Sequence, residues 1–177
     1  FVSSHINISM KNLKILFTFL CFIYSTFSFA QKSFPEKCLG EWEGMMYIYS
    51  NGSLVDSVST SFDVARTEEP HTFTWITSYH SPTQPMVKDY KLKLIDAEKK
   101  LYAVDEGNSI ALHSYLFDNK LYSVFETQGI LLTSSYELMG ENLVFEVTSG
   151  TNLEPGKDVM NYSVRNLQRV VFKKKKE

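Results

Sequence analysis

From Cys38 onward, apolar and polar residues alternate in short segments rich in Val, Ile, Tyr, Phe and Thr. Alternation over four to eight residues, bounded by turn residues, is typical of half-buried β-strands. The pattern predicts about ten such strands. They cover 41–50, 53–66, 71–80, 86–95, 100–105, 109–117, 120–127, 130–138, 142–148 and 160–172.

The connections between these segments carry turn-forming residues. Asn51-Gly52 is a preferred pair for a type I′ hairpin, and Asp118-Asn119 and Gly140-Glu141-Asn142 also favour tight turns. The connection 81–85 is a wider loop, because its two prolines cannot donate to a ladder. The best helical candidate after residue 30 is the short segment 32–39, which Pro35 interrupts.

Consecutive strands with short links form an antiparallel meander, and a long meander exposes two edges unless it closes. We therefore expect an all-β fold, an antiparallel up-and-down β-barrel of about ten strands. Phe73, Trp75, Thr77 and Tyr79 share one face of their strand, so the predicted interior combines large aromatic residues with small polar ones. Barrels of this size commonly hold one small ligand. A barrel filled by its own side chains is the alternative.

The segment Leu39-Gly40-Glu41-Trp42-Glu43-Gly44 opens the first predicted strand. It resembles the Gly-x-Trp signature of lipocalin-like, or calycin, barrels, and its longer Gly-x-Trp-x-Gly form is similar to nitrobindin-like and uncharacterised secreted bacterial barrel families. In calycins the Trp closes the barrel floor and an Arg of the last strand packs over its ring. The resemblance implies these structural roles for Trp42 and Arg169, with Gly40 and Gly44 completing the signature.

Residues 10–30 are similar to a secretory signal peptide. Lys11 and Lys14 precede an apolar run over 15–24, which is shorter than the ~20 residues of a membrane span. Ser28 and Ala30 are the small residues expected before a cleavage site, so we expect cleavage before Gln31. This divides the chain into 1–30, with translation starting at Met10, and a single barrel domain over 31–177 with a basic tail. The expected location is secreted or periplasmic, without a transmembrane segment after cleavage; an uncleaved anchor is the alternative.

Charge and cysteine content narrow the classes of function. The formal net charge of −2 becomes more negative once Lys11 and Lys14 are removed, which argues against nucleic acid binding. Only Cys38 would remain after cleavage, so an internal disulfide and a four-cysteine zinc site are excluded. The run Lys173–Lys176 is either a solvated end or a segment that docks on anionic lipid.

Motifs of catalysis and metal binding are missing from the sequence. It has no Gly-x-Ser-x-Gly elbow, no His-Glu-x-x-His and no Gly-rich phosphate loop, so we assign no catalytic residue and no metal ligand. Nitrobindin-like barrels bind haem through a histidine late in the chain, but no histidine follows His113. We expect no cofactor; haem on His71 or His113 is an alternative. The sequence leaves catalysis undecided and favours a binding protein over a cofactor-free isomerase.

Aromatic residues of the predicted interior are the candidate ligand contacts, because rings offer apolar area and phenols can orient one polar group. These candidates are Phe73, Trp75, Tyr79, Tyr90, Tyr115, Phe125 and Tyr136. We therefore expect a secreted barrel that binds a small, mostly apolar, lipid-like molecule. The alternative is a filled barrel that acts as an interaction or inhibitor module of the cell envelope, with the loops 81–85 and 150–157 contacting a protein partner.

Overall fold

The computed structural model describes residues 32–152 and 159–176. The predicted signal peptide, residues 10–30, and part of the loop 150–157 lie outside the described residues. The short helix α2 (Phe34–Cys38) precedes ten strands. The strands are β1 (Gly40–Ser50), β2 (Ser53–Val64), β3 (Thr72–Tyr79), β4 (Met86–Asp96), β5 (Leu101–Gly107), β6 (Ile110–Phe117), β7 (Lys120–Thr127), β8 (Ile130–Met139), β9 (Asn142–Asn152) and β10 (Tyr162–Lys174).

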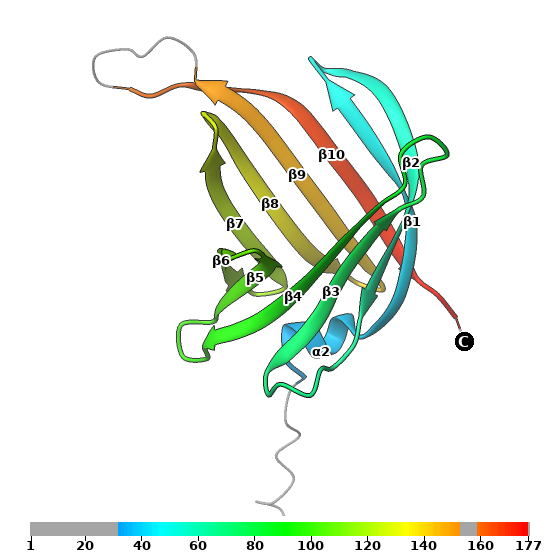
Figure 1. Cartoon of the computed structure of the whole chain (residues 1–177), viewed down its shortest axis with the longest axis vertical. Helices are drawn as coiled ribbons and strands as arrows, with labels where there is room; N and C mark the ends of the chain where they lie inside the picture. Colours follow the sequence, from blue (N-terminus) through cyan, green and yellow to red (C-terminus); the bar gives the residue numbers. More distant parts are fainter. Residues whose placement is uncertain (1–31, 153–158, 177) are drawn as a thin grey trace, which may run out of the picture. The chain divides into compact units, whose positions relative to one another are not determined.

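These strands form one closed antiparallel barrel (Figure 1). Each strand pairs with its neighbours in sequence, and β1 pairs with β10 to close the sheet. The predicted all-β, up-and-down barrel is therefore confirmed, with strand bounds within a few residues of those expected from the alternation. Asn51 and Gly52 both have positive φ, at 49° and 79°, as a type I′ hairpin requires.

Helix α2 occupies the segment that Pro35 was expected to interrupt. Pro35 instead lies in the first turn, where a helix needs no N–H donor. The backbone N–H of Ser33 donates to the Glu36 carboxylate at 2.9 Å, which completes the N-terminal cap. Phe34, Pro35 and Cys38 are buried, so the helix covers one end of the barrel with its apolar residues.

An aromatic core fills the barrel next to α2. The ring of Trp75 lies edge-on to Phe62, with centroids 4.8 Å apart, and it also contacts Phe34 and Tyr136. Phe172 also stacks on the Phe62 ring, with centroids 5.7 Å apart. Within the described part of the chain, the indole N–H of Trp75 has no hydrogen-bond acceptor, although the residue is fully buried. The end of the barrel at α2 is therefore the closed end.

The structure corrects the expected partner of Trp42. The buried Trp42 donates its indole N–H to the carbonyl of Cys38 at 2.7 Å, consistent with its expected place in the floor. The cation over its ring is Lys174, with Nζ 5.5 Å from the centroid. Arg169 is 45% exposed and pairs with Glu146 at 3.4 Å. Arg169 and Lys174 are five positions apart, an odd number, so their side chains face opposite sides of β10.

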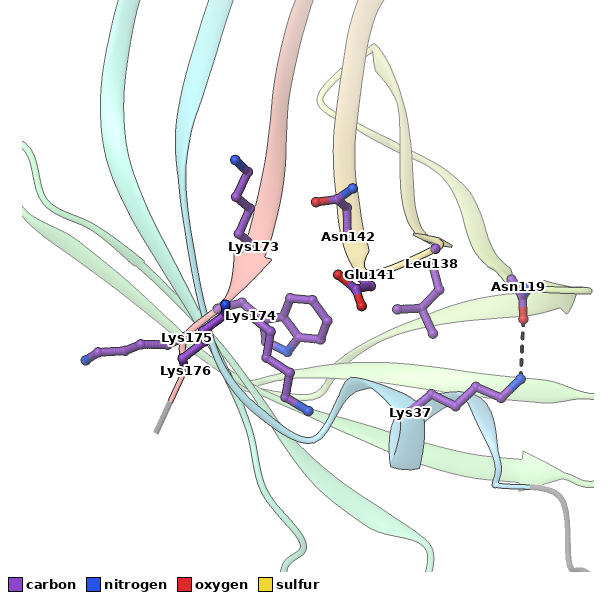
Figure 2. Close-up of a pocket in the computed structure, with 11 residues that line it drawn as sticks. Lys37, Asn119, Leu138, Glu141, Asn142, Lys173, Lys174, Lys175 and Lys176 are labelled. Carbon is purple, nitrogen blue, oxygen red and sulfur yellow. Dashed lines mark hydrogen bonds between the residues drawn. The ribbon is translucent and has the colours of Figure 1, made fainter.

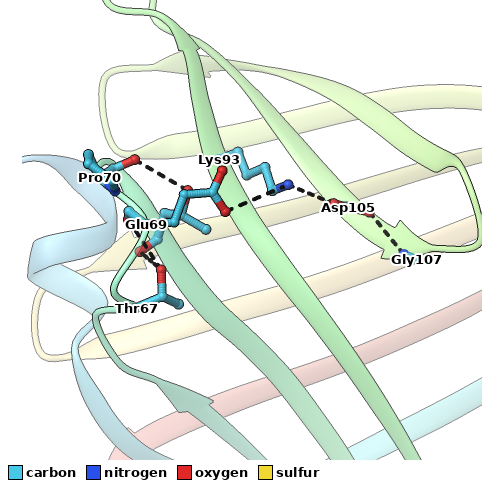
Figure 3. A network of polar contacts seen from close by, with 7 residues as sticks. Thr67, Glu69, Pro70, Lys93, Asp105 and Gly107 are labelled. Atoms are coloured by element: carbon cyan, nitrogen blue, oxygen red, sulfur yellow. Dashed lines mark hydrogen bonds and ion pairs between the residues drawn. The ribbon is translucent and has the colours of Figure 1, made fainter.

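A polar cluster on the outer wall holds the connection between β2 and β3 against the sheet (Figure 3). Lys93 on β4 pairs with Asp105 on β5 at 3.0 Å and lies 3.9 Å from Glu69 in that connection. The other Asp105 oxygen accepts a hydrogen bond from the Gly107 N–H at 3.0 Å. These groups are exposed or half-buried, and the cluster therefore serves as a link between neighbouring segments.

Candidate ligand cavity

A cavity of about 270 Å³ lies inside the barrel, on the far side of the aromatic core from α2. Its walls come from β3 to β10, and its lining combines aromatic, aliphatic and polar side chains. The lining residues are Thr77, Tyr79, Lys88, Tyr90, Val104, Glu106, Leu112, Ser123, Phe125, Leu132, Ser134, Tyr136, Phe145, Val147 and Gln168. The barrel is therefore closed by side chains at one end and hollow at the other.

Four of the seven predicted ligand contacts line this cavity: Tyr79, Tyr90, Phe125 and Tyr136. Phe73 and Trp75 belong to the buried core and are absent from the lining. Their strand presents its aromatic face inward, as the alternation indicates, but only its last residues reach the hollow part of the barrel. The sequence identified the correct face of β3 without showing where along that face the core ends.

Tyr115 was assigned to the wrong side of the wall. Its side chain is 46% exposed, and its ring lies 6.5 Å from that of Phe117 on the outer surface. Along β6 it is Leu112 that lines the cavity and Ser114 that is buried. Because successive strand residues face opposite sides, Tyr115 must point outward. An aromatic side chain alone was a poor indicator of the inner face.

The phenols of the cavity are held in their neutral, hydrogen-bond-donating form. Burial, the charge of Glu106 and a hydrogen bond to it raise the pKa of Tyr90 to about 12. Burial also raises the pKa of Tyr79, and it raises that of Tyr136 well above its ordinary value. At neutral pH the cavity therefore offers hydroxyl groups rather than phenolate charges.

Two charged residues of the cavity were not predicted from the sequence. Lys88 lies opposite Thr77 in the β3–β4 ladder, and its Nζ is 5.9 Å from the centroid of the Tyr90 ring. Glu106 lies on β5 beside Tyr90. The signal was available, since Lys88 precedes Tyr90 by two residues and so shares its face. These groups can orient the polar end of a bound molecule.

The histidines do not assemble a site in the described residues. No histidine lines the cavity. His80 lies within 3.0 Å of the Ser61 hydroxyl, and His113 is exposed on the strand that carries Tyr115. Over residues 32–152 and 159–176, no group of three or more His, Cys, Asp or Glu residues is arranged to hold a metal ion. In the same ranges no helix has the length and apolar character needed to span a bilayer.

Comparison with known proteins adds information at the level of the fold. No family model matches the chain, and no curated protein matches it. A protein of unknown function from the DUF3598 family of Nostoc punctiforme PCC 73102 superposes with a TM-score of 0.57 at 14% identity, covering 79% of this chain and 48% of that chain. The chain thus spans about half the length of that protein.

A second solved structure is the S-type phycobiliprotein lyase CpeS from Guillardia theta. It superposes with a TM-score of 0.57 at 10% identity, covering 81% of this chain and 92% of that chain. The two similarities, together with the closed antiparallel topology, give the barrel a lipocalin-like fold.

Proposed function

We propose that this protein is an exported barrel that binds a small, mostly apolar, lipid-like molecule in the cavity at its open end. The observation that carries the proposal is the composition of the cavity wall. Aromatic and aliphatic side chains supply apolar area, while neutral phenols, Lys88 and Glu106 supply a few polar groups. That combination is the usual one for a site that binds a small organic molecule.

The volume of the cavity limits what can be enclosed. At about 270 Å³ it is slightly smaller than the range of roughly 300–1,000 Å³ usual for ligand pockets. A ring system or a short acyl segment fits inside, whereas a longer chain must extend past the rim. Met86, Ile110 and Ile130 lie toward that rim on the same face of their strands as cavity residues, and they are 47%, 49% and 38% exposed. An apolar tail would cover these side chains.

The energetics set the expected strength of binding. A ring-sized guest that buries about 200 Å² of apolar surface gains ~5 kcal/mol at ~25 cal/mol per Å². The loss of translational and rotational freedom offsets much of this gain. Hydrogen bonds and a charge contact inside the cavity are therefore needed to reach micromolar affinity, which assigns the polar residues a part in selecting the ligand.

Export of the protein is part of this proposal. It is supported by the sequence of residues 10–30, in which two lysines, a short apolar run and small residues follow one another. The test is N-terminal sequencing of protein recovered outside the cytoplasm after expression of the full chain. A new N-terminus at Gln31 is expected, and a chain that stays in the cytoplasm with residues 10–30 attached would count against export.

The binding proposal is tested by titrating the protein with a fluorescent fatty-acid analogue. We expect saturable binding that weakens about tenfold when Phe125→Ala removes an aromatic wall of the cavity. Tyr115→Ala is the matched control, because it removes an aromatic residue of the outer wall and should leave the affinity unchanged. A linear signal without saturation, or equal losses in the two variants, would contradict binding in the cavity.

A further inference from the structure

A second and larger hollow lies at the closed end of the barrel, away from the ligand cavity. It measures about 910 Å³ and shares no lining residue with the cavity. It lies between α2, the β6–β7 and β8–β9 turns and the end of β10 (Figure 2). Its lining residues are Lys37, Trp42, Asn119, Leu138, Gly140, Glu141, Asn142 and Lys173–Lys176.

The charge of this hollow contrasts with that of the whole protein. Five of its described lining residues are lysines, and Glu141 is the one carboxylate among them. The complete chain has 18 Lys and Arg against 20 Asp and Glu. More than a quarter of its cationic side chains therefore border one hollow. The Lys175 ammonium is paired with the Glu41 carboxylate. The like charges of the other lysines repel one another, and a bound anion would offset that repulsion.

Lys174 and Lys175 are held in place by contacts with β1. Lys174 lies opposite Trp42 in the β1–β10 ladder with its ammonium over the indole ring. Lys175 donates its backbone N–H to the Glu41 carbonyl at 2.9 Å, and its side chain pairs with the Glu41 carboxylate at 3.1 Å. From the sequence, a solvated end was one of two interpretations of Lys173–Lys176. These contacts order the segment as far as Lys175.

Two lysines from distant parts of the chain, Lys37 and Lys174, border the hollow from different elements. In Figure 2 the Lys174 side chain extends from β10 toward α2, while Lys37 extends from α2 toward Asn119. The Lys37 ammonium donates to the Asn119 side-chain oxygen at 3.4 Å. Lysine ammonium groups and side-chain amides are donors suited to the several oxygens of a phosphate, and a doubly charged group can satisfy more than one lysine.

We infer that this hollow binds a phosphate-bearing anion, chiefly through Lys37 and Lys174, with Glu141 limiting the affinity. A soluble phosphorylated molecule and the headgroup of an anionic lipid present the same chemistry to these side chains. The site is separate from the ligand cavity, and its test does not depend on the proposed function.

The first experiment is a calorimetric titration of the protein with inorganic pyrophosphate at constant ionic strength. We expect saturable binding that weakens about tenfold or more in the double variant K37Q/K174Q. The matched control is K91Q/K99Q, which removes the same charge from exposed lysines outside the hollow and should weaken binding about threefold or less. Glu141→Gln removes the opposing charge and should strengthen it.

Thermal unfolding separates a binding role from a structural one. Without pyrophosphate, K37Q/K174Q loses the Lys174–Trp42 and Lys37–Asn119 contacts as well as the repulsion between the two charges, so the informative quantity is the shift in melting temperature that pyrophosphate produces. Pyrophosphate should raise the melting temperature of the wild type alone. A lower melting temperature for K37Q/K174Q, with no effect of pyrophosphate on the wild type, would show a structural role and overturn the inference.

Vesicle flotation then distinguishes the two sources of phosphate. Vesicles of phosphatidylcholine are compared with vesicles that also contain phosphatidylglycerol. Flotation that requires phosphatidylglycerol, Lys37 and Lys174 identifies a lipid headgroup, whereas pyrophosphate binding without flotation identifies a soluble phosphate. The inference fails if neither probe binds, or if K91Q/K99Q loses as much affinity as K37Q/K174Q.

Discussion

Gly44, the last residue of the Gly-x-Trp-x-Gly motif, lies in the middle of β1 where β10 passes close to the backbone. A Cβ atom added there would lie 2.7 Å from Cγ2 of Val170 and 2.7 Å from the carbonyl oxygen of Val171. Real Cβ atoms do not approach other atoms so closely, so one of the two strands must move. The Val170 side chain is fully buried and the Val171 carbonyl belongs to the sheet, which leaves little room for adjustment.

Gly44→Ala should therefore destabilise the barrel. Forcing an extra carbon into a packed site costs about 1–3 kcal/mol, and for a chain of this size that lowers the melting temperature by roughly 2–12 °C. The measurement is thermal and urea unfolding followed by circular dichroism. Met45→Ala is the control, since Met45 is the next residue and is 44% exposed, and it should change stability by no more than about 0.5 kcal/mol.

A double-mutant cycle tests the cause of this effect. Val170→Ala removes the Cγ2 atom but leaves the Val171 carbonyl in place. The Gly44→Ala cost should therefore be smaller in the Val170→Ala background, yet not vanish. Unchanged stability of Gly44→Ala, or equal costs in the two backgrounds, would refute the argument that the glycine is required by the close approach of β10.

The remaining predictions concern buried or capped groups at the closed end. The hydrogen bond from the Ser33 backbone, together with Arg66, lowers the pKa of Glu36 to about 2. The ionised Glu36 therefore stabilises the fold above the ordinary carboxyl pKa, and this stabilisation is lost as the pH falls to about 2. In Glu36→Gln, the urea midpoint of unfolding should depend less on pH between the ordinary carboxyl pKa and about 2. Burial raises the pKa of Cys38 to about 12, so iodoacetamide should modify it only in unfolded protein, as peptide mass mapping will show. Trp42→Phe should destabilise the protein by about 1 kcal/mol or more in urea unfolding, because it leaves the Cys38 carbonyl without the Trp42 N–H donor.

Local sequence signals were sufficient to predict the strands and their connections. Alternation of apolar and polar residues shows which segments form strands. A pair such as Asn51-Gly52 predicts a turn because both residues readily adopt positive φ. Closure into a barrel followed from the length of the meander, because a closed sheet leaves no exposed edge. Pro35 was misinterpreted because the same residue that breaks a helix interior is favoured in its first turn.

Contacts between distant strands could not be read from the sequence in the same way. The partner of Trp42 depends on the register of β1 against β10, which places Lys174 opposite Trp42 and Arg169 opposite Tyr47, five positions away along β10. Aromatic character does not specify which face of a strand a residue occupies, and the exposed Tyr115 is therefore not where its ring predicts. Lys88 and Glu106 were overlooked because charged side chains are rarely expected inside a barrel, although the hollow end of this one accommodates them.

The pairing between strands explains how a cavity of modest volume can admit a lipid-like molecule. The β2–β3 ladder extends only from Thr60–Tyr79 to Asp63–Ile76, and the β6–β7 ladder is limited to three pairs near Phe117 and Lys120. The β2–β3 ladder includes the cavity residue Tyr79, but the β6–β7 ladder lies toward the closed end, so β6 and β7 share no ladder pair beyond Tyr115–Tyr122 on the side of the open end. Local opening costs least where few backbone bonds and little buried apolar surface hold a segment. The end that contains the cavity is therefore also the end that can widen, while the aromatic core and α2 keep the other end fixed.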